Sequence, residues 1–204
     1  MHAQVHGKRC VIKKVRLAKL SNAERQASLM ELLLLSNLSH RNILTYLDAW
    51  VESGCISCLA VELCECGDLM TQLRVRAGQQ QHFHEVHLQD MLVQLASCLA
   101  YMHNQGITHR DLKCSNVFIT GAGCLKLADF GLAAILDPDD PVSRTMVGTP
   151  NYMSPQVLRD EPYGVENDIW ALGCVMYELS ALRPAFQVRV GHGAGGQSNR
   201  SGCV

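Results

Sequence analysis

The chain has 204 residues, of which 48% are hydrophobic, and its formal net charge at pH 7 is -1. This length suffices for one large domain or two small lobes, and the near-neutral charge argues against a nucleic-acid binder, which usually carries a basic stripe. The opening stretch lacks the apolar core of a signal peptide, and no run reaches the ~18 apolar residues that a membrane span needs. We therefore expect a soluble, cytoplasmic protein with no nucleic-acid or membrane partner.

The first third of the chain predicts strands around one helix. The stretch "RCVIKKVRL" alternates and is β-branched, which predicts a strand, whereas no strand is assigned to "MHAQVHG" before it. Ser21 and Glu24 form a capping box ahead of leucines at helical spacing, which predicts a helix. Two more strands are expected in "NILTYLDAWVE" and "ISCLAVELC", joined by a turn at Ser53 and Gly54.

The remainder predicts two longer helices and a long irregular segment. Apolar spacing indicates an amphipathic helix from Glu85 to Asn104, and "NVFIT" and "CLKLA" after it predict two short strands joined by "GAG". Residues 131–155 contain four of the six prolines and are expected to be irregular. The stretch "NDIWALGCVMYELSAL" is apolar on nearly every side, which is typical of a buried helix, and residues 187–204 are expected to be unstructured.

The cysteines and histidines raise the alternative of a metal site. Cys55 and Cys58, and Cys64 and Cys66, have spacings close to those of zinc ligands. We favour mostly buried, reduced thiols, because strand alternation alone would place Cys64 and Cys66 on one face. The second candidate is a histidine cluster made of His82, His84 and His87. We favour a solvated approach to a helix there, since no fourth ligand lies nearby in the sequence.

The strongest motif is "HRDLKCSN" at residues 109–116, which fits the pattern H-R-D-L-x-x-x-N, followed by "DFG" from Asp129. Phosphoryl transfer needs an acceptor for a hydroxyl proton, cations beside the phosphates and oxygen ligands for magnesium. Asp111, Lys113, Asn116 and Asp129 are residue types that meet most of these needs.

From "VIK" to "DIWALGCVMYEL" the chain resembles a eukaryotic protein kinase catalytic domain. Within that family, "ELLLLSNLSHRNIL", "CECGDLM" and "MVGTPNYMSPQ" are most similar to the NIMA-related serine/threonine kinases. The resemblance implies an α+β, two-lobed kinase-like fold. It also implies a partial small lobe at residues 1–62, a partial large lobe with catalytic loop and activation segment at residues 63–186, and a tail at 187–204.

The resemblance assigns the chemistry residue by residue. It implies that Asp111 is the catalytic base, that Lys113 steadies the transferred phosphate, and that Asn116 and Asp129 bind Mg²⁺. Lys13 in "CVIK" would bind the phosphates of ATP while paired with a helix glutamate.

Glu31 is the best candidate for that glutamate. Two alternatives remain open: Lys14 as the lysine, although alternation points it to the opposite face, and Glu24 as the acid, although the capping box uses it. His109, Phe130 and Leu35 are expected to serve packing.

Further nucleotide contacts are implied in the linker between the lobes. Val61 resembles the gatekeeper, and Glu62 and Cys64 resemble the positions whose backbone bonds adenine. Asp68 is expected to approach the ribose, and Phe118 belongs to the expected ATP-binding set. The expected cofactors are ATP and Mg²⁺.

Substrate type and regulation also follow from the resemblance. Lys113 and Thr149 favour serine/threonine acceptors in protein substrates. Arg110 beside the catalytic aspartate resembles kinases that are activated by phosphorylation. Thr145 is the first candidate phosphosite, and Ser143 is the second.

The sequence departs from the kinase pattern at both ends. The glycine-rich loop and its strands are missing ahead of Lys13, and "GHGAGG" at residues 191–196 matches only in letters, because no helix follows it. "SPQ" replaces the usual A-P-E and places Gln156 where a glutamate pairs with an arginine, while Asp168, which resembles the anchor of the catalytic loop, is retained. We expect an ATP-dependent serine/threonine kinase in an incomplete form of doubtful activity. The alternative is an inactive kinase-like fragment that acts only by binding proteins.

Overall fold

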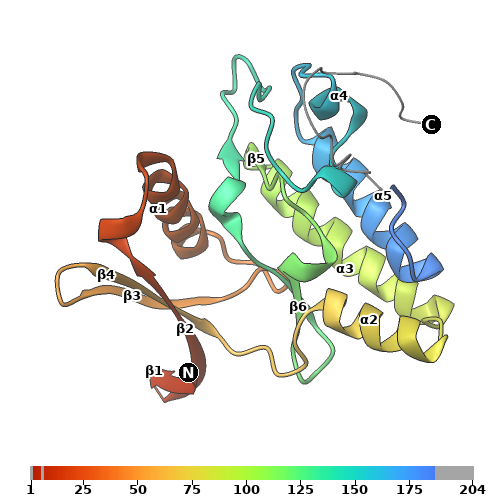
Figure 1. Ribbon diagram of the computed structural model, residues 1–204, viewed down its shortest axis with the longest axis horizontal. Coiled ribbons are helices and arrows are strands. Elements are labelled where there is room, and N and C mark those ends of the chain that lie inside the picture. Colours follow the sequence, from red (N-terminus) through yellow and green to blue (C-terminus); the bar gives the residue numbers. More distant parts are fainter. Residues whose placement is uncertain (1, 6, 187–204) are drawn as a thin grey trace, which may run out of the picture.

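The computed structural model describes residues 2–5 and 7–186 and has the mixed α+β content that the sequence predicts. A four-stranded antiparallel sheet and one helix form the first part of the molecule, and a mainly helical part follows (Figure 1). The strands lie in the order β1-β2-β4-β3. Their bounds are His2–Val5 for β1, Lys8–Arg16 for β2, Tyr46–Glu52 for β3 and Ile56–Glu62 for β4.

Strands β2, β3 and β4 confirm the three strands expected in the first part of the chain. The turn between β3 and β4 is the predicted one, and Ser53 and Gly54 both have a positive φ, of 53° and 67°. Strand β1 lies in the opening stretch to which the sequence assigned no strand, and it forms by antiparallel backbone pairing with β2. The predicted boundary after residue 62 falls at the end of β4 and stays a prediction.

Helix α1 (Asn22–Asn37) begins at the predicted capping box. The Ser21 backbone N–H donates to Glu24 Oε2 at 2.8 Å, and the Glu24 N–H donates to Ser21 Oγ at 3.3 Å. These bonds satisfy two of the free N–H groups at the helix start. The buried residues of α1 are Glu31, Leu34 and Leu35. The helix therefore presents one acidic side chain to the interior.

Three longer helices build the second part: α2 (Leu69–Gln79), α3 (Glu85–His103) and α5 (Glu166–Ala181), with a single-turn helix α4 (Pro155–Leu158) before α5. Helix α3 confirms the expected helix that ends before Gly106. Helix α2 was not predicted, because it buries only two leucines and its apolar pattern is weak.

Two short antiparallel strand pairs flank the loops that carry the motifs. Strand β5 (Ile107–Thr108) pairs with β8 (Ala134–Ile135), and β6 (Val117–Ile119) pairs with β7 (Leu125–Leu127). The 3-10 turns are η1 (Leu17–Lys19), η2 (Cys114–Asn116), η3 (Phe130–Leu132) and η4 (Pro150–Tyr152). Apart from β8, η3, η4 and the start of α4, residues 131–155 are irregular, as predicted.

One continuous hydrophobic core runs from α1 and β4 through α3 to α5. The expectation that α5 is buried on nearly every side is wrong for the described residues. Ile169, Trp170 and Tyr177 are exposed, whereas Asp168 and Glu178 are among its buried residues. An apolar circumference allows burial of a helix, but packing against α3 and η4 selects one face.

The cysteine expectation holds only in part. Cys55 and Cys66 are exposed, and the alternation argument for Cys64 and Cys66 is wrong because both lie beyond the end of β4. Within residues 2–5 and 7–186, no cluster of three His, Cys, Asp or Glu side chains is arranged to hold a metal. In that same range no helix has the length and apolar character to cross a membrane. The tail at 187–204 and "GHGAGG" lie outside the described residues.

Candidate active site

Asp168 on α5 holds the backbone of the catalytic loop. Its fully buried carboxylate accepts hydrogen bonds from the N–H groups of His109 at 2.8 Å and Arg110 at 2.9 Å. Thr108 Oγ1 at 3.0 Å and His103 Nε2 at 2.9 Å also donate to it. Burial acts to raise the pKa of Asp168, but the hydrogen bonds from His103 and from the His109 and Arg110 N–H groups lower it overall. An ionised carboxylate therefore fixes the loop, including Arg110 with its φ of 64°.

Asp111 lies at the centre of the site and is 8% exposed. Lys113 Nζ is 2.6 Å from its Oδ2, and the Thr149 hydroxyl donates to its Oδ1 at 2.6 Å. Lys113 Nζ also donates to Thr149 Oγ1 at 2.8 Å. Asn116 Nδ2 donates to the backbone oxygen and to Oδ2 of Asp111, at 2.9 Å and 3.1 Å. Lys113 and Asn116 from "HRDLKCSN" and Thr149 from "GTP" thus meet at the Asp111 carboxylate.

His109 and Phe130 pack behind this carboxylate, as expected. Both are fully buried, and their rings meet edge-on with centroids 5.1 Å apart. The Asp111 N–H donates to His109 Nδ1 at 3.3 Å, so the remaining proton of a neutral ring lies on Nε2, 3.1 Å from the Ala128 oxygen. Both ring nitrogens of His109 are hydrogen-bonded to backbone groups, so this side chain stabilises the loop.

Asn116 directly precedes β6 and Asp129 follows β7, so both lie at the same end of the β6-β7 hairpin. The Ala128 N–H donates to the Asn116 oxygen at 2.9 Å, which brings the residue before Asp129 beside Asn116. Asp129 is exposed with a φ of 65°, and within the described chain its carboxylate forms no hydrogen bond or ion pair. An exposed carboxylate one residue from the backbone bond to Asn116 suits Mg²⁺, which takes few protein ligands together with phosphate and water.

Lys13 on β2 contacts Glu31 on α1. Lys13 Nζ lies 2.8 Å from Oε1 and 2.6 Å from Oε2, and the carboxylate is almost buried while the lysine is half exposed. Lys14 points to the other face and pairs with Glu52 at 2.6 Å. Of the alternatives that the sequence left open, the structure brings Lys13 and Glu31 together.

The linker residues lie where β4 ends and the helical part begins. Val61 is buried, and Glu62 and Cys64 are half-buried. Burial raises the pKa of the Cys64 thiol to about 12, so it stays protonated at neutral pH. Asp68 caps α2 by accepting from the Thr71 N–H at 2.7 Å. Phe118 on β6 forms a backbone bridge with Asp68, which brings these two expected nucleotide contacts side by side.

The two candidate phosphosites differ in environment. Arg110 Nη1 donates to Ser143 Oγ at 2.9 Å, and its Nε donates to the Leu132 oxygen at 2.6 Å. Ser143 is buried, whereas Thr145 is exposed, and its backbone oxygen accepts a hydrogen bond from the Tyr163 hydroxyl at 2.6 Å. The structure therefore brings the second candidate to Arg110 and leaves the first in solvent.

Sequence reasoning missed residues that contact the site from far along the chain. Lys126 pairs with Glu62 at 2.7 Å, and buried Glu178 accepts from the hydroxyl of Tyr152 and from Cys114 Sγ. The Tyr152 hydroxyl thereby ties η4 to α5. No short-range spacing could reveal these pairs, because each joins different elements.

Comparison with known proteins agrees with this arrangement. The family model described as the protein kinase domain matches residues 1–199. Serine/threonine-protein kinase Nek3 of Oryza sativa subsp. japonica is 44% identical over 184 residues, which cover 90% of this chain and 31% of that protein. Serine/threonine-protein kinase Nek4 of Mus musculus is 40% identical over 183 residues, covering 90% of this chain and 23% of that protein. Serine/threonine-protein kinase Nek1 of Mus musculus is 39% identical over 181 residues, covering 89% and 15%.

A catalytic loop anchored on α5 and a lysine-glutamate pair between sheet and helix are therefore those of a protein kinase, and the chain belongs to the protein kinase domain family. The relatives are NIMA-related kinases, which confirms the subfamily that the sequence motifs predict. The chain spans no more than 31% of the length of these three relatives.

Proposed function

We propose that this chain is the catalytic part of an ATP-dependent serine/threonine protein kinase, which transfers the γ-phosphoryl group of ATP to Ser and Thr hydroxyls of proteins. The observation that carries this proposal is the set of contacts at Asp111. Lys113, Asn116 and Thr149 all lie within hydrogen-bond distance of its carboxylate. Asp111 is thereby held in one orientation beside a cation.

Asp111 acts as the general base. The Thr149 hydroxyl, which donates to Oδ1, occupies the direction from which a hydroxyl donor reaches this carboxylate. A substrate hydroxyl donates in the same way, passes its proton to Asp111 and bonds through oxygen to the γ-phosphorus as the bond to ADP breaks. Lys113 stays charged beside the transferred group and offsets its negative charge.

The nucleotide site is assigned to the residues that the resemblance implies. Lys13, oriented by Glu31, binds phosphate oxygens. The proposed adenine and ribose contacts are Val61, Glu62, Cys64, Asp68 and Phe118. Asn116 and Asp129 hold Mg²⁺, which when bound neutralises charge on the phosphates. The uncommitted carboxylate of Asp129 supports this assignment.

Regulation by phosphorylation is part of the proposal. Thr145 is exposed and so accessible to a modifying kinase, and Ser143 already contacts the Arg110 guanidinium. A phosphate on this segment adds about -1.5 to -2 charges, which Arg110 can pair. The proposed partners are protein substrates with Ser or Thr acceptors. None of the described cysteines is in a disulfide bond, which supports a reducing, cytoplasmic location.

The test of the function is Asp111→Asn in the full-length protein. Because an amide cannot accept the substrate proton as a base, we expect phosphorylation of serine and threonine peptides to fall by ~10²-fold or more. Initial rates with radiolabelled ATP provide the measurement, and tyrosine peptides should stay poor substrates.

The matched control is Asp139→Asn, the same chemical change at an exposed position of the irregular segment. It should leave the rate within about twofold, as is usual for surface substitutions. Equal rates for Asp111→Asn and the unchanged protein would contradict the proposed base.

A further inference from the structure

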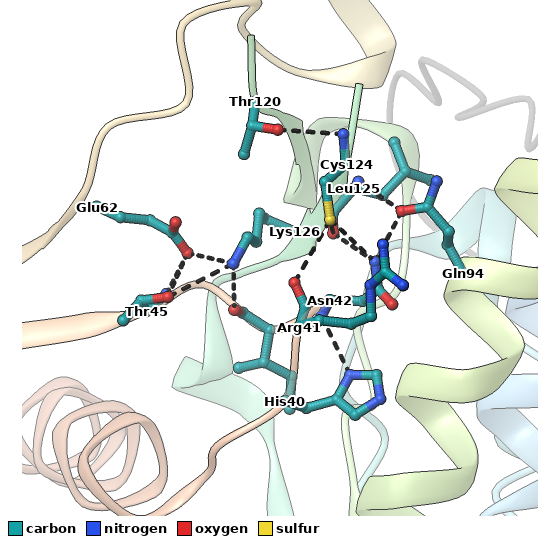
Figure 2. A network of polar contacts seen from close by, with 11 residues as sticks. His40, Arg41, Asn42, Thr45, Glu62, Gln94, Thr120, Cys124, Leu125 and Lys126 are labelled. Atoms are coloured by element: carbon teal, nitrogen blue, oxygen red, sulfur yellow. Dashed lines mark hydrogen bonds and ion pairs between the residues drawn. The ribbon is translucent and has the colours of Figure 1, made fainter. Parts of the chain in front are cut away.

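Glu62, Thr45 and Lys126 form a polar cluster at the junction between the sheet and the helical part (Figure 2). The Glu62 carboxylate accepts the hydrogen bonds of the other two residues. Glu62 Oε1 accepts from Lys126 Nζ at 2.7 Å, from the Thr45 N–H at 2.7 Å and from Thr45 Oγ1 at 2.6 Å. The Glu62 N–H in turn donates to the Thr45 oxygen at 3.0 Å. Both the side chain and the peptide of Glu62 are therefore fixed to the same neighbour.

Lys126 reaches this cluster from β7. It is 8% exposed, and its Nζ also lies 3.5 Å from the Ile43 oxygen and from Thr45 Oγ1. A buried ammonium needs a charged partner, and Glu62 supplies it. Lys126 stands directly opposite Phe118 in the β6-β7 pairing, so the two side chains share one face of the hairpin. Two adjacent positions of the hairpin thus carry Phe118, a member of the expected ATP-binding set, and Lys126, the cation that pairs with Glu62 in the linker.

The residues directly before Thr45 are bonded to β7, in the helical part of the molecule. The Leu127 N–H donates to the Asn42 oxygen at 2.8 Å, and the Leu44 N–H donates to the Leu127 oxygen at 2.9 Å. Asn42 Nδ2 donates to the Leu125 oxygen at 2.9 Å. Residues 42–44 therefore run alongside β7, although in the sequence they lead into β3 of the sheet. Through Thr45 and Lys126, the position of Glu62 is set by β7.

We propose that Lys126 and Thr45 are positioning residues for nucleotide binding. They hold the Glu62 end of the linker at the distance from β6 and β7 at which its backbone meets adenine. The proposal rests on the proposed function, which assigns that backbone to the nucleotide. Binding groups must be held to within about 0.5 Å of their productive position. Loss of the Lys126 and Thr45 contacts to Glu62 therefore weakens ATP binding more than it slows the chemical step at Asp111.

The experiment uses Lys126→Met in the full-length protein, which keeps side-chain length and removes the charge. We expect the KM for ATP and the Kd for Mg-ATP to rise about three- to tenfold, with kcat at saturating ATP within about twofold. Lys126→Arg should restore most of the affinity. Thr45→Val should raise the KM in the same direction, and Thr45→Ser should not.

Lys14→Met is the matched control. Lys14 on β2 pairs with Glu52 on β3 at 2.6 Å, in the sheet that also contains Glu62. Both side chains are about half exposed, and neither lies on the linker. Its KM for ATP should be unchanged. An equal rise in Lys14→Met would overturn the proposal, because it would reflect a general loosening of the sheet.

Lys13→Met separates failure of this proposal from failure of the proposed function. If Lys13→Met leaves ATP affinity and phosphorylation unchanged, the proposed function fails. If Lys13→Met abolishes activity while Lys126→Met leaves the KM for ATP unchanged or alters only kcat, the positioning role alone fails. Should Lys126→Met not fold, Thr45→Val decides in the same way, since it leaves the buried ion pair intact.

Discussion

At the scale of single residues, two buried serines of the irregular segment differ in their partners. Ser154 is 3% exposed, and among the described residues its Oγ has no hydrogen-bond partner. Ser143 is 8% exposed, and its Oγ accepts from Arg110. A buried hydroxyl costs free energy unless it is bonded, so the two side chains contribute to stability with opposite sign.

This difference predicts opposite effects of the same substitution. Ser154→Ala should leave the free energy of unfolding unchanged or raise it by ~1 kcal/mol, whereas Ser143→Ala should lower it by ~1 kcal/mol. Urea unfolding of the unphosphorylated protein measures both. Loss of stability in Ser154→Ala equal to that in Ser143→Ala would show that Ser154 is satisfied by a partner such as water.

Lysine selection on β2 also belongs to the residue scale. Alternation predicts that Lys13 and Lys14 point to opposite faces, and the structure confirms this, since one pairs with Glu31 on α1 and the other with Glu52 on β3. The face that meets α1 is the one that can share a buried carboxylate. Position in a two-residue repeat thus separates the expected phosphate ligand from a surface ion pair.

At the scale of elements, α1 matters because it carries Glu31 to Lys13. Its start depends on the capping box, in which Ser21 and Glu24 each satisfy a backbone N–H of the other. Most of its first turns are exposed, so tertiary packing contributes little there. Local capping therefore carries an unusual share of the stability of this helix.

Ser21→Ala should accordingly lower the free energy of unfolding by ~1 kcal/mol, and Ser21→Asp should restore it, because a carboxylate also caps. Ser36→Ala is the matched control in the same helix. Ser36 Oγ donates to the Leu33 oxygen of its own turn and accepts a long bond of 3.3 Å from Asn37 Nδ2, which keeps its shorter bond to Leu33 when the hydroxyl is removed. That change should therefore be neutral or slightly stabilising. Thermal unfolding followed by circular dichroism compares the three; equal losses in Ser21→Ala and Ser36→Ala would contradict the capping argument.

Helix α2 shows the limit of element prediction. It begins at a good cap, Asp68, and ends at Gln80 with a φ of 53°, but only Leu69 and Leu73 are buried between them. Its polar sequence carries little periodicity. Contact with η2 and β6 stabilises this helix, which the spacing of apolar residues does not predict.

At the scale of the whole molecule, the site joins both parts of the chain. Lys13 and Glu31 come from the sheet and α1, whereas Asn116 and Asp129 come from the second part. A ligand that contacts both sets binds only the folded arrangement. Mg-ATP should therefore stabilise the folded state of the full-length protein.

At 100 times its Kd, a ligand adds ~2.7 kcal/mol to the free energy of unfolding, which is measurable as a rise in Tm. Asp129→Asn should abolish the Mg²⁺-dependent part of this shift, since an amide is a poor ligand for Mg²⁺. ATP with excess chelator in place of Mg²⁺ should give the same reduced shift. An undiminished Mg²⁺-dependent shift in Asp129→Asn would refute the assigned metal ligand, and Asp139→Asn serves as the control for the substitution itself.

The sequence by itself determined the short-range features. The spacing within "HRDLKCSN" is enough to predict that Asp111, Lys113 and Asn116 act together, since all three lie within six consecutive residues. Alternation, capping and turn residues likewise predicted β2, α1 and the turn between β3 and β4. Each of these depends on interactions between neighbours in the chain.

Only the tertiary structure decided the contacts between distant segments. The burial of one face of α5, the hydrogen bond from Thr149 to Asp111 and the clamp of Lys126 on Glu62 each depend on how separate elements pack. A charged or polar side chain far along the sequence carries no mark of its partner, because its pairing is set by which backbones the core brings together. Lys126 in "CLKLA" is therefore indistinguishable from a surface lysine until the fold brings it to Glu62 at the end of β4.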